Sequence, residues 1–261
     1  MKSTIIKTCK QESEYRNNCI ARDDIPSLSE MEVDGEVRNL GIVKHFKSHP
    51  PLSKLLPPAF AIAWVHLDPD EVLEVHSHNV ASLIISAQGL ATSQGDSNIS
   101  FSSGDIVLIP AWNEHGFTGG HPDGLWALSI QFNEVAIFES DVDPLTTYHL
   151  DEKPSIEERQ LVVYGREQGV NNPSLSHLTD LIPSHIHFEW QKVDRHFVYT
   201  PSHDQKTCLM IVCSLDYPVL VDGNVMHEGS IVIVKDVTTM TALSEPANAW
   251  VLVVEFEAGE E

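Results

Sequence analysis

The chain has 261 residues, enough for one large domain or two modest ones, and its apolar content of 42% is ordinary for a globular protein. Acidic residues (38) far outnumber basic ones (16), and the resulting formal charge of −22 repels phosphate backbones and anionic lipids, so we expect neither nucleic acid nor a membrane as a partner. The N-terminus lacks the apolar segment of an export signal and no run approaches the roughly 18 apolar residues of a membrane span, so we expect a cytoplasmic protein.

Taken in chain order, most of the sequence alternates between apolar and polar residues in short segments that end at Gly, Pro, Asp or Asn. This period of two is typical of β-strands. The clearest examples are FAIAWVHL (60–67), ASLIISAQG (81–89), DIVLIPAW (105–112) and LWALSIQF (125–132). Helical periodicity is scarce, and the one short helix that the sequence predicts lies around SIEERQLVVYG (155–165). The sequence therefore predicts an all-β fold.

An internal repeat organises the chain, because a shift of about 125 residues aligns the sequence with itself. Four segments match in the same order: FAIAW, HSHNVASLII, GDIVLI and LWALSIQF match HFEW, PSHDQKTCLM, GSIVIV and AWVLVVEF. Repetition at this period indicates two copies of one β domain. The acidic, proline-containing stretch 139–154 is the expected boundary between them.

Three histidines of the first copy have the spacing of a metal site. His76 and His78 are two residues apart on an alternating stretch, so both side chains face the same side of a strand. His115 follows the next apolar strand and can arrive from another strand end. Three imidazoles on one side of a cation leave coordination positions open for water or substrate.

The residues around these histidines resemble the two motifs of the cupin superfamily, G-x5-H-x-H-x3,4-E-x6-G and G-x5-P-x-G-x2-H-x3-N. The matching stretches are DEVLEVHSHNVASLIISAQG (70–89) and GDIVLIPAWNEHGFTG (104–119). The resemblance covers both repeats and implies two tandem cupin barrels, each a double-stranded β-helix or jelly roll. We therefore expect an N-terminal arm (1–35) that packs on the barrels, a metal-binding barrel (36–140) and a degenerate, structural barrel (141–261).

The chain departs from the cupin pattern at three positions. Ser82 stands where cupins usually have a glutamate ligand, Trp112 replaces a turn glycine, and Gly119 replaces the final asparagine. The expected site is thus three neutral imidazoles, similar to that of the cupin thiol dioxygenases and diketone-cleaving dioxygenases, with Glu74 and Glu114 as alternative sources of a carboxylate. Such a donor set favours one divalent transition metal, Fe(II) first, with Mn, Ni or Zn as alternatives.

The second repeat lacks this ligand set. The aligned positions hold Pro201, His203, Thr207 and Met240. One imidazole cannot hold a catalytic cation, so we expect the second barrel to be structural and metal-free.

The last strands of the two repeats share one face and differ on the other. On the shared apolar face, which we expect in the core of each copy, Trp126, Leu128 and Phe132 match Trp250, Leu252 and Phe256. The opposite face changes from Ala127, Ser129 and Gln131 to Val251, Val253 and Glu255, and Ser86 becomes Ile211. Small or polar side chains in the first copy predict an open pocket there. We expect it to be lined by Trp64, Ser82, Ser86, Trp112, Phe117, Ser129 and Gln131.

Three functions are compatible with such a pocket. The first is a mononuclear Fe(II) dioxygenase acting on a small organic acid or other small metal-chelating metabolite, because three-histidine iron sites in the cupin superfamily often have this activity. The second is a metal-dependent isomerase or lyase, in which the cation acts only as a Lewis acid on an enolisable substrate. The third is a non-catalytic small-ligand-binding cupin, because the stretch from His76 to His115 also resembles the sensory domains of AraC-type regulators. The sequence favours the oxygenase with a small-molecule substrate, and it is compatible with a homodimer.

Overall fold

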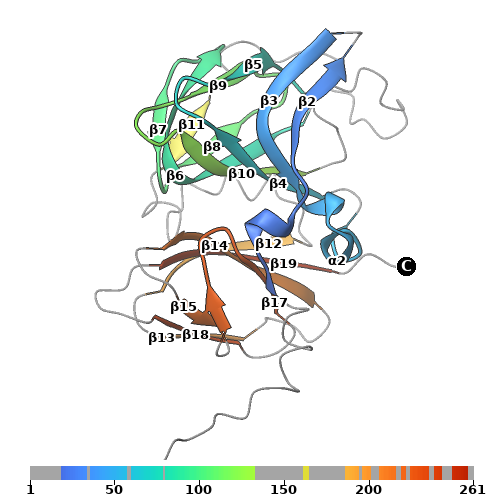
Figure 1. Ribbon diagram of the computed structural model, residues 1–261, viewed down its shortest axis with the longest axis vertical. Helices are drawn as coiled ribbons and strands as arrows, with labels where there is room; N and C mark the ends of the chain where they lie inside the picture. Colours follow the sequence, from blue (N-terminus) through green and yellow to red (C-terminus); the bar gives the residue numbers. More distant parts are fainter. Residues whose placement is uncertain are drawn as a thin grey trace, which may run out of the picture.

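The computed structural model describes twelve segments of the chain, and strands dominate them, as the alternating sequence predicts. The described residues are 19–33, 36–57, 60–78, 80–132, 161–164, 186–193, 196–200, 206–215, 219–221, 224–234, 238–242 and 249–257. Figure 1 shows that the strands form two curled antiparallel units, one stacked on the other.

The first barrel is built from ten antiparallel strands. These are β2 (Leu28–Val33), β3 (Glu36–His45), β4 (Phe60–Leu67), β5 (Val72–His76), β6 (Ser82–Gly95), β7 (Ser100–Ser102), β8 (Ile106–Ile109), β9 (His115–Gly119), β10 (Leu125–Phe132) and β11 (Val162–Tyr164). The main path runs in the order β11-β8-β6-β10-β4-β3-β2. Strand β9 pairs with both β5 and β6, and β7 pairs with the second half of β6, so these strands close the opposite wall.

Strand β6 can serve both walls because it bends at Gly89. The register between β6 and β10 shifts next to this position, which marks a β-bulge. Gly89 has a φ of 73°, and a Cβ there would lie 2.0 Å from the carbonyl oxygen of Gly124. Only glycine tolerates both conditions. This explains why the last glycine of the first motif is present in the sequence.

The second barrel contains two smaller antiparallel sheets, with orders β1-β17-β14-β19-β12 and β13-β18-β15-β16. Their strands are β1 (Cys19–Ile20), β12 (Ile186–Val193), β13 (His196–Tyr199), β14 (Lys206–Leu215), β15 (Val219–Val221), β16 (Asn224–Met226), β17 (Ile231–Val234), β18 (Thr238–Ala242) and β19 (Ala249–Glu257). Strand β18 pairs with β13 and β15 as β9 pairs with β5 and β6, so the repeat in the sequence is also a repeat of topology.

Strands at the start of each sequence repeat pair with the barrel that the other repeat forms. Strand β1 pairs with β17 of the second barrel, whereas β2, a few residues later, pairs with β3 of the first. Strand β11 pairs with β8 of the first barrel, although it follows the stretch expected to separate the domains. That expected boundary, 139–154, lies outside the described residues.

Helical segments are few among the described residues. They are the 3-10 turns η2 (Arg22–Asp24) and η3 (Phe46–Ser48) and the single-turn helix α2 (Pro50–Ser53). The helix predicted around 155–165 is wrong for its last residues, because Val162–Tyr164 form strand β11 on the open edge of β8. Two valines and a tyrosine favour the extended conformation offered by that edge. Residues 155–160 lie outside the described part of the chain. No helix among the described residues is long and apolar enough to span a membrane.

Three apolar clusters stabilise the molecule, one in each barrel and one between the barrels. The face shared by the last strands of the repeats was expected in the core of each copy, and it lies in the apolar cluster between the barrels. Trp64, Leu128, Leu252 and Phe256 all belong to the cluster between the barrels. Each barrel therefore turns its shared apolar face to the other, and the residues that differ between the repeats point inward.

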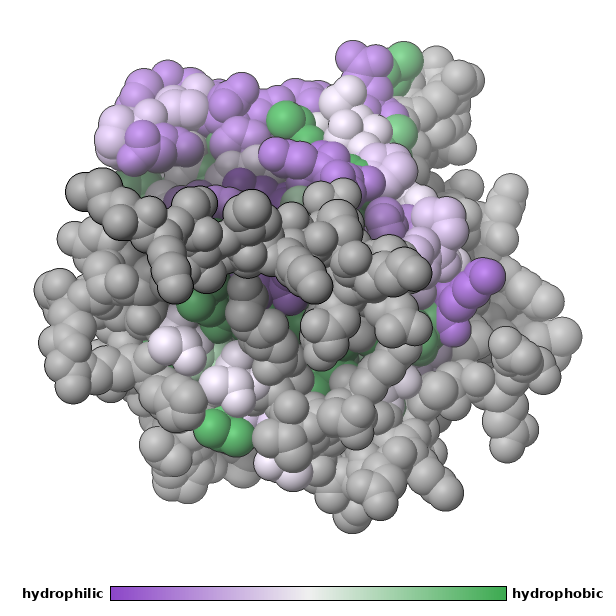
Figure 2. All heavy atoms as spheres, turned by 60° about the horizontal axis from the view of Figure 1, so that its bottom comes forward, coloured by the Kyte–Doolittle hydropathy of each residue, from purple (hydrophilic) through white to green (hydrophobic). Residues whose placement is uncertain are grey.

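The exposed surface carries little clustered apolar area. In Figure 2 the hydrophobic residues that are coloured on this face appear as small separate groups. The large exposed hydrophobic residues of the described segments are Leu28, Val37, Val72, Val75, Leu90, Val198 and Val225. Single exposed apolar side chains of this kind are normal for a folded protein.

Candidate metal centre

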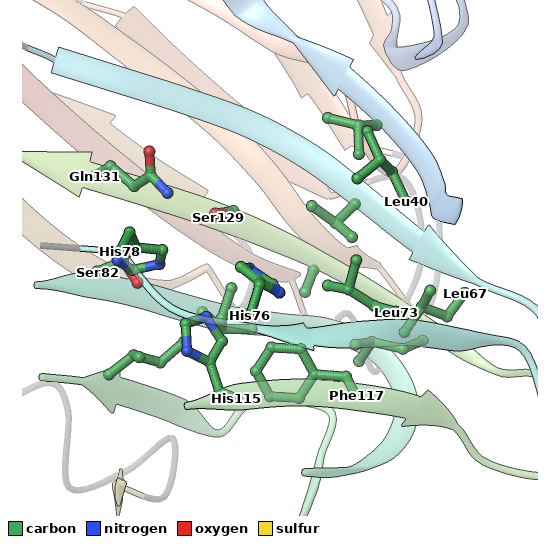
Figure 3. Close-up of a pocket in the computed structure, with 16 residues that line it drawn as sticks. Leu40, Leu67, Leu73, His76, His78, Ser82, His115, Phe117, Ser129 and Gln131 are labelled. Atoms are coloured by element: carbon green, nitrogen blue, oxygen red, sulfur yellow. The ribbon is translucent and has the colours of Figure 1, made fainter. Parts of the chain in front are cut away.

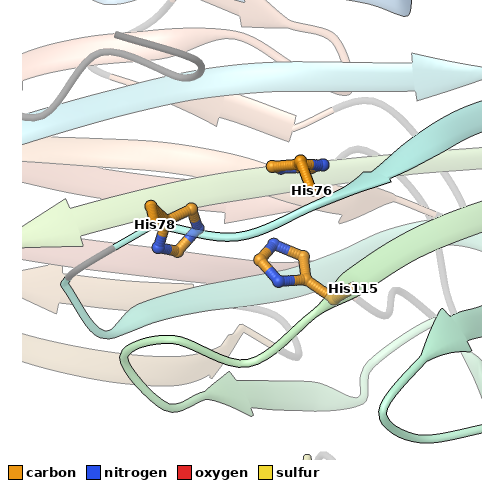
Figure 4. A group of neighbouring side chains, drawn as sticks. All are labelled: His76, His78 and His115. Carbon is orange, nitrogen blue, oxygen red and sulfur yellow. The ribbon is translucent and has the colours of Figure 1, made fainter. Parts of the chain in front are cut away.

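Three histidines from two strand ends meet inside the first barrel. His76 is the last residue of β5, His78 follows it by two residues, and His115 is the first residue of β9. The pairing of β5 with β9 sets His76 directly opposite His115. One potential ligand nitrogen from each ring lies within 4.8 Å of the other two, and Figure 4 shows the three rings around a common space. The three imidazoles are thus close enough to share a single cation after small side-chain movements.

Each imidazole is held in one tautomer by a backbone carbonyl. The Nδ1 atoms of His76, His78 and His115 lie 2.8, 2.7 and 2.9 Å from the carbonyl oxygens of Glu74, Val80 and Asn113. A carbonyl oxygen only accepts, so each Nδ1 must carry the proton and donate it. Each Nε2 then carries the lone pair through which an imidazole binds a metal. Orientation of ligating histidines through their second nitrogen is the usual arrangement in metal sites.

Burial keeps the three rings neutral. Burial is the main cause of a lowered pKa in all three. It lowers the pKa of His76, lowers the pKa of His78 to about 4, and holds the pKa of His115 well below its usual value. The neighbouring histidines lower the last two further, because three cationic rings cannot share this space. All three imidazoles are therefore unprotonated at neutral pH, which is the form that binds metal.

No carboxylate completes the set among the described residues, where the histidines form the one group of potential ligands. Glu74 turns away to Arg38, whose Nη1 lies 2.6 Å from its carboxylate oxygen. Glu114 is exposed, on the opposite side of β9 from His115. Ser82 borders the cavity at the position of the usual cupin glutamate. The donor set is thus three neutral nitrogens with no protein anion beside them.

A cavity extends from the histidines into the barrel (Figure 3). Four of the residues predicted to line it do so: Ser82, Phe117, Ser129 and Gln131. The remaining lining is apolar, apart from the histidines, and consists of Leu40, Val43, Val65, Leu67, Leu73, Ile84, Ile109, Leu125 and Ala127. No side chain that lines the cavity carries a formal charge at neutral pH.

Three residues predicted to line the pocket do not border it. Trp64 faces the space between the barrels, because the alternation of β4 turns its neighbours Ala63 and Val65 inward instead. Ser86 is fully buried next to the β-bulge of β6 and pairs with Ala127, but it does not itself border the cavity. Trp112 occupies a turn with a φ of 64°, and its backbone N–H donates to the carbonyl of His78 at 2.7 Å. Trp112 thus fastens its turn to the site through the backbone.

Strand register identifies the matching positions in the second barrel. Ser82 pairs with Gln131 and Ile109, and Cys208 pairs with Glu255 and Val234, so Cys208 is the counterpart of Ser82, in place of the predicted Thr207. The loop before β18 is two residues shorter than the loop before β9, which moves the counterpart of His115 from Met240 to Thr238.

His76 pairs with His115 as Tyr199 pairs with Thr238, so Tyr199 takes the position of His76. Its hydroxyl donates to the carboxylate of Glu255, and both side chains are buried. Pro201 and His203 lie outside the described residues. A tyrosine that is hydrogen-bonded to Glu255 thus stands where the first barrel has His76.

Comparison with solved structures shows a shared architecture at low sequence identity. The bacterial pirin YhhW from Escherichia coli, in complex with nickel(II), aligns with a TM-score of 0.56 at 10% identity over 92% of this chain and 98% of its own. Oxalate decarboxylase from Bacillus subtilis, studied for its Mn(II) centres, aligns with a TM-score of 0.52 at 12% identity over 100% of this chain and 86% of its own. Both are bicupins. The chain has the bicupin fold.

A further solved structure has the same architecture at similarly low identity. Vicilin from Capsicum annuum aligns with the bicupin chain with a TM-score of 0.56 at 11% identity, over 93% of this chain and 86% of its own. No family model matches the sequence, and no curated protein matches it. These identities support the fold, and the chemistry has to be argued from the site.

Sequence reasoning missed two features of the site. The carbonyls that orient the imidazoles belong to Glu74, Val80 and Asn113, and backbone groups leave no signal in a sequence. Leu40 and Val43 of β3 line the cavity from outside both cupin motifs. They are three residues apart, so regular strand alternation would place them on opposite faces, and only the structure, with a positive φ at Gly41 between them, shows that both line the cavity.

Proposed function

We propose that this bicupin is a mononuclear Fe(II) dioxygenase-type oxidoreductase that acts on a small metal-chelating metabolite, such as a small organic acid. The observation that carries the proposal is the convergence of three neutral imidazoles beside an uncharged cavity. His76, His78 and His115 would hold the metal, and their backbone hydrogen bonds fix them for it in advance. A bound Fe(II) would supply the one-electron chemistry with O₂ that zinc lacks.

The residues around the metal position support binding of a chelating anion. Three neutral ligands leave the full +2 charge of the cation, and the cavity wall offers no carboxylate to offset it. An anionic substrate would therefore be attracted by positive charge that a protein carboxylate would otherwise neutralise. Ser82, short and neutral, leaves room for two substrate atoms at the place where a glutamate would reach. Phe117 and Leu73, both buried, exclude water from the space behind the histidines.

The same lining argues against a Lewis-acid isomerase or lyase. Such a reaction moves a proton to or from carbon, so it needs a titratable side chain close to the bound substrate. Apart from the three histidines, the polar side chains that line the cavity are Ser82, Ser129 and Gln131. None of these is a general base near neutral pH without a basic partner.

An anaerobic loading experiment tests the proposed activity. Protein loaded with one equivalent of Fe(II) is mixed with small carboxylates, thiols or diketones and then exposed to air, while O₂ consumption and product are measured. We expect O₂-dependent turnover with at least one chelating class, and none with Zn(II) in place of Fe(II). Turnover that proceeds without O₂, or equally well with zinc, would instead support the isomerase or lyase. Tight binding of a chelator with no turnover would support a ligand-binding protein.

A further inference from the structure

The cavity beside the histidines has a polar end and an apolar end, and strand register fixes which is which. At one end Gln131 pairs directly with Ser82. At the other end Leu125 pairs with Leu67, and Leu73 pairs with Phe117. In Figure 3 the first pair lies beside His78, the labelled apolar side chains Leu40, Leu67, Leu73 and Phe117 lie together on the far side, and His76 and His115 lie between. A ligand on the metal therefore meets hydrogen-bonding groups on one flank and hydrocarbon on the other.

The apolar end begins within reach of a group attached to a metal-bound head. The ring centroids of His115 and Phe117 are 5.8 Å apart. Beyond Phe117 the walls are fully apolar and buried, with Leu67, Leu73 and Leu125 at most 9% exposed. Burying a charged group against these walls is strongly unfavourable, because no partner of opposite charge lines the cavity. This end admits a hydrocarbon substituent and rejects a carboxylate or an ammonium.

The space is also small. The cavity volume is about 40 Å³, which is small for a ligand site. Part of it belongs to the coordinating atoms of the ligand. The substituent is therefore limited to a few carbon atoms.

We propose that the substrate is an anionic chelator that carries one short, uncharged hydrocarbon substituent, with the chelating head between the histidines and the Ser82–Gln131 end and the substituent between Phe117 and Leu125. This inference rests on the proposed function, because it requires a metal at the three histidines. The side-chain amide of Gln131 and the hydroxyl of Ser82 donate hydrogen bonds to oxygen atoms of the head. Chelators whose second substituent is a carboxylate or an ammonium group are excluded.

A series of hydroxamates with one constant chelating head measures this selectivity without O₂. Protein loaded with Co(II), which reports ligand binding in its visible spectrum, is titrated anaerobically with aceto-, propiono- and butyrohydroxamate, succinic acid monohydroxamate and β-alanine hydroxamate. We expect affinity to rise about fourfold with each added methylene in the alkyl series. The two charged tails should bind at least tenfold more weakly than butyrohydroxamate. Equal or tighter binding of either charged tail would overturn the proposal.

A pair of variants locates the substituent. Val251, which precedes Leu252 on β19, is the counterpart of Ala127, which precedes Leu128 on β10. Ala127→Val therefore introduces the side chain that the second barrel has at the same position. This change should remove the advantage of butyro- over acetohydroxamate. The matched control is Ala91→Val, also fully buried in the first barrel but not bordering the cavity, which should keep the advantage. If Ala127→Val keeps it too, the substituent lies elsewhere and the proposal is wrong.

The outcomes separate this inference from the proposed function. The expected hydroxamate ranking together with no O₂ consumption by the Fe(II) protein would retain the substrate class and overturn the oxygenase. O₂-dependent turnover together with a reversed ranking would retain the oxygenase and overturn the substrate class. Failure of the protein to bind Co(II) would overturn both.

Discussion

Gln131 and Glu255 occupy the same register position in the two barrels, since Gln131 pairs with Ser82 as Glu255 pairs with Cys208. In the first barrel the amide borders an open cavity beside three histidines. In the second the carboxyl group accepts a hydrogen bond from Tyr199, at the position of a ligand. The same register position thus borders a cavity in the first barrel and takes part in a buried hydrogen bond in the second.

Removing two ligands should abolish metal binding and leave the fold intact. We expect His76→Ala combined with His115→Ala to lower the metal content from about one ion per chain to less than a tenth, because a single imidazole is left. Metal content is measured on protein purified without chelators, and far-UV circular dichroism reports the fold. His121→Ala, an exposed histidine that contacts Asp70, is the control and should keep its metal. Unchanged metal content in the double variant would contradict the assignment of the site.

The second barrel should lose stability when its buried hydrogen bond is removed. Burial, with Glu255 and Cys208 as further causes, raises the pKa of Tyr199, so the phenol stays protonated and donates to Glu255. We expect Tyr199→Phe to lower the free energy of unfolding by about 1–3 kcal/mol, measured by urea denaturation. A double-mutant cycle with Glu255→Gln isolates the interaction between the two side chains. Additive effects of the two changes would show that this hydrogen bond does not hold the barrel interior together.

The second barrel should also bind no transition metal of its own. Cys208, Glu255 and Tyr199 are engaged with one another at the positions that match the first site. We expect wild-type protein to hold at most one tightly bound ion per chain, all of it lost in the double histidine variant described above. Residual stoichiometric metal in that variant, removed by further substitution of Cys208, would place a second site in this barrel.

The sequence predicted the fold well because its strongest signals are local. Alternation marks the strands, and the spacing from His76 to His115 marks two strand ends that face one cavity. Trp64 could not be placed the same way. Both faces of β4 are apolar, because one faces the interior of the first barrel and the other packs against the second barrel. Alternation alone does not distinguish these two faces. The counterpart of His115 was misplaced for a related reason, because a loop shorter by two residues shifts the alignment without changing the strand pattern.

The contact between the barrels should respond to pH through Glu228. Burial raises the pKa of this carboxyl group to about 7, although the nearby Arg22 acts in the opposite direction. Gln88 of the first barrel donates a hydrogen bond to it, and Arg22 itself stacks 3.7 Å from the ring centre of Trp126. Between the ordinary value of 4.5 and about 7, the folded protein keeps a proton that the unfolded chain has lost. Stability from this group is therefore present below pH 4.5 and is lost as the pH rises to about 7.

Replacing this carboxyl group by an amide removes the titration. We expect Glu228→Gln to reduce the fall in unfolding free energy between pH 5 and 7.5 by about 1 kcal/mol, a value that allows for the partial exposure of the side chain. Urea denaturation at the two pH values measures the difference. Glu30→Gln, on the exposed edge strand β2, is the control and should leave the wild-type pH dependence in place. The same pH dependence in Glu228→Gln as in wild type would exclude this carboxyl group as its source.

Restoring the usual cupin carboxylate at Ser82 should tighten the metal and close the site. Ser82 borders the cavity beside His78, so a glutamate there reaches the metal position and offers an anionic oxygen to the cation. We expect Ser82→Glu to raise Co(II) affinity about tenfold in competition with a chelating dye, because the added charge offsets part of the +2 left by three imidazoles. The same carboxylate occupies space that a bidentate ligand needs. Acetohydroxamate binding should therefore weaken at least tenfold, and any O₂ consumption by the Fe(II) protein should fall with it.

Ser82→Ala is the control, since loss of a hydroxyl that is not a ligand should leave Co(II) affinity within about twofold of wild type. Unchanged hydroxamate affinity in Ser82→Glu would show that the open coordination positions do not lie on the Ser82 side.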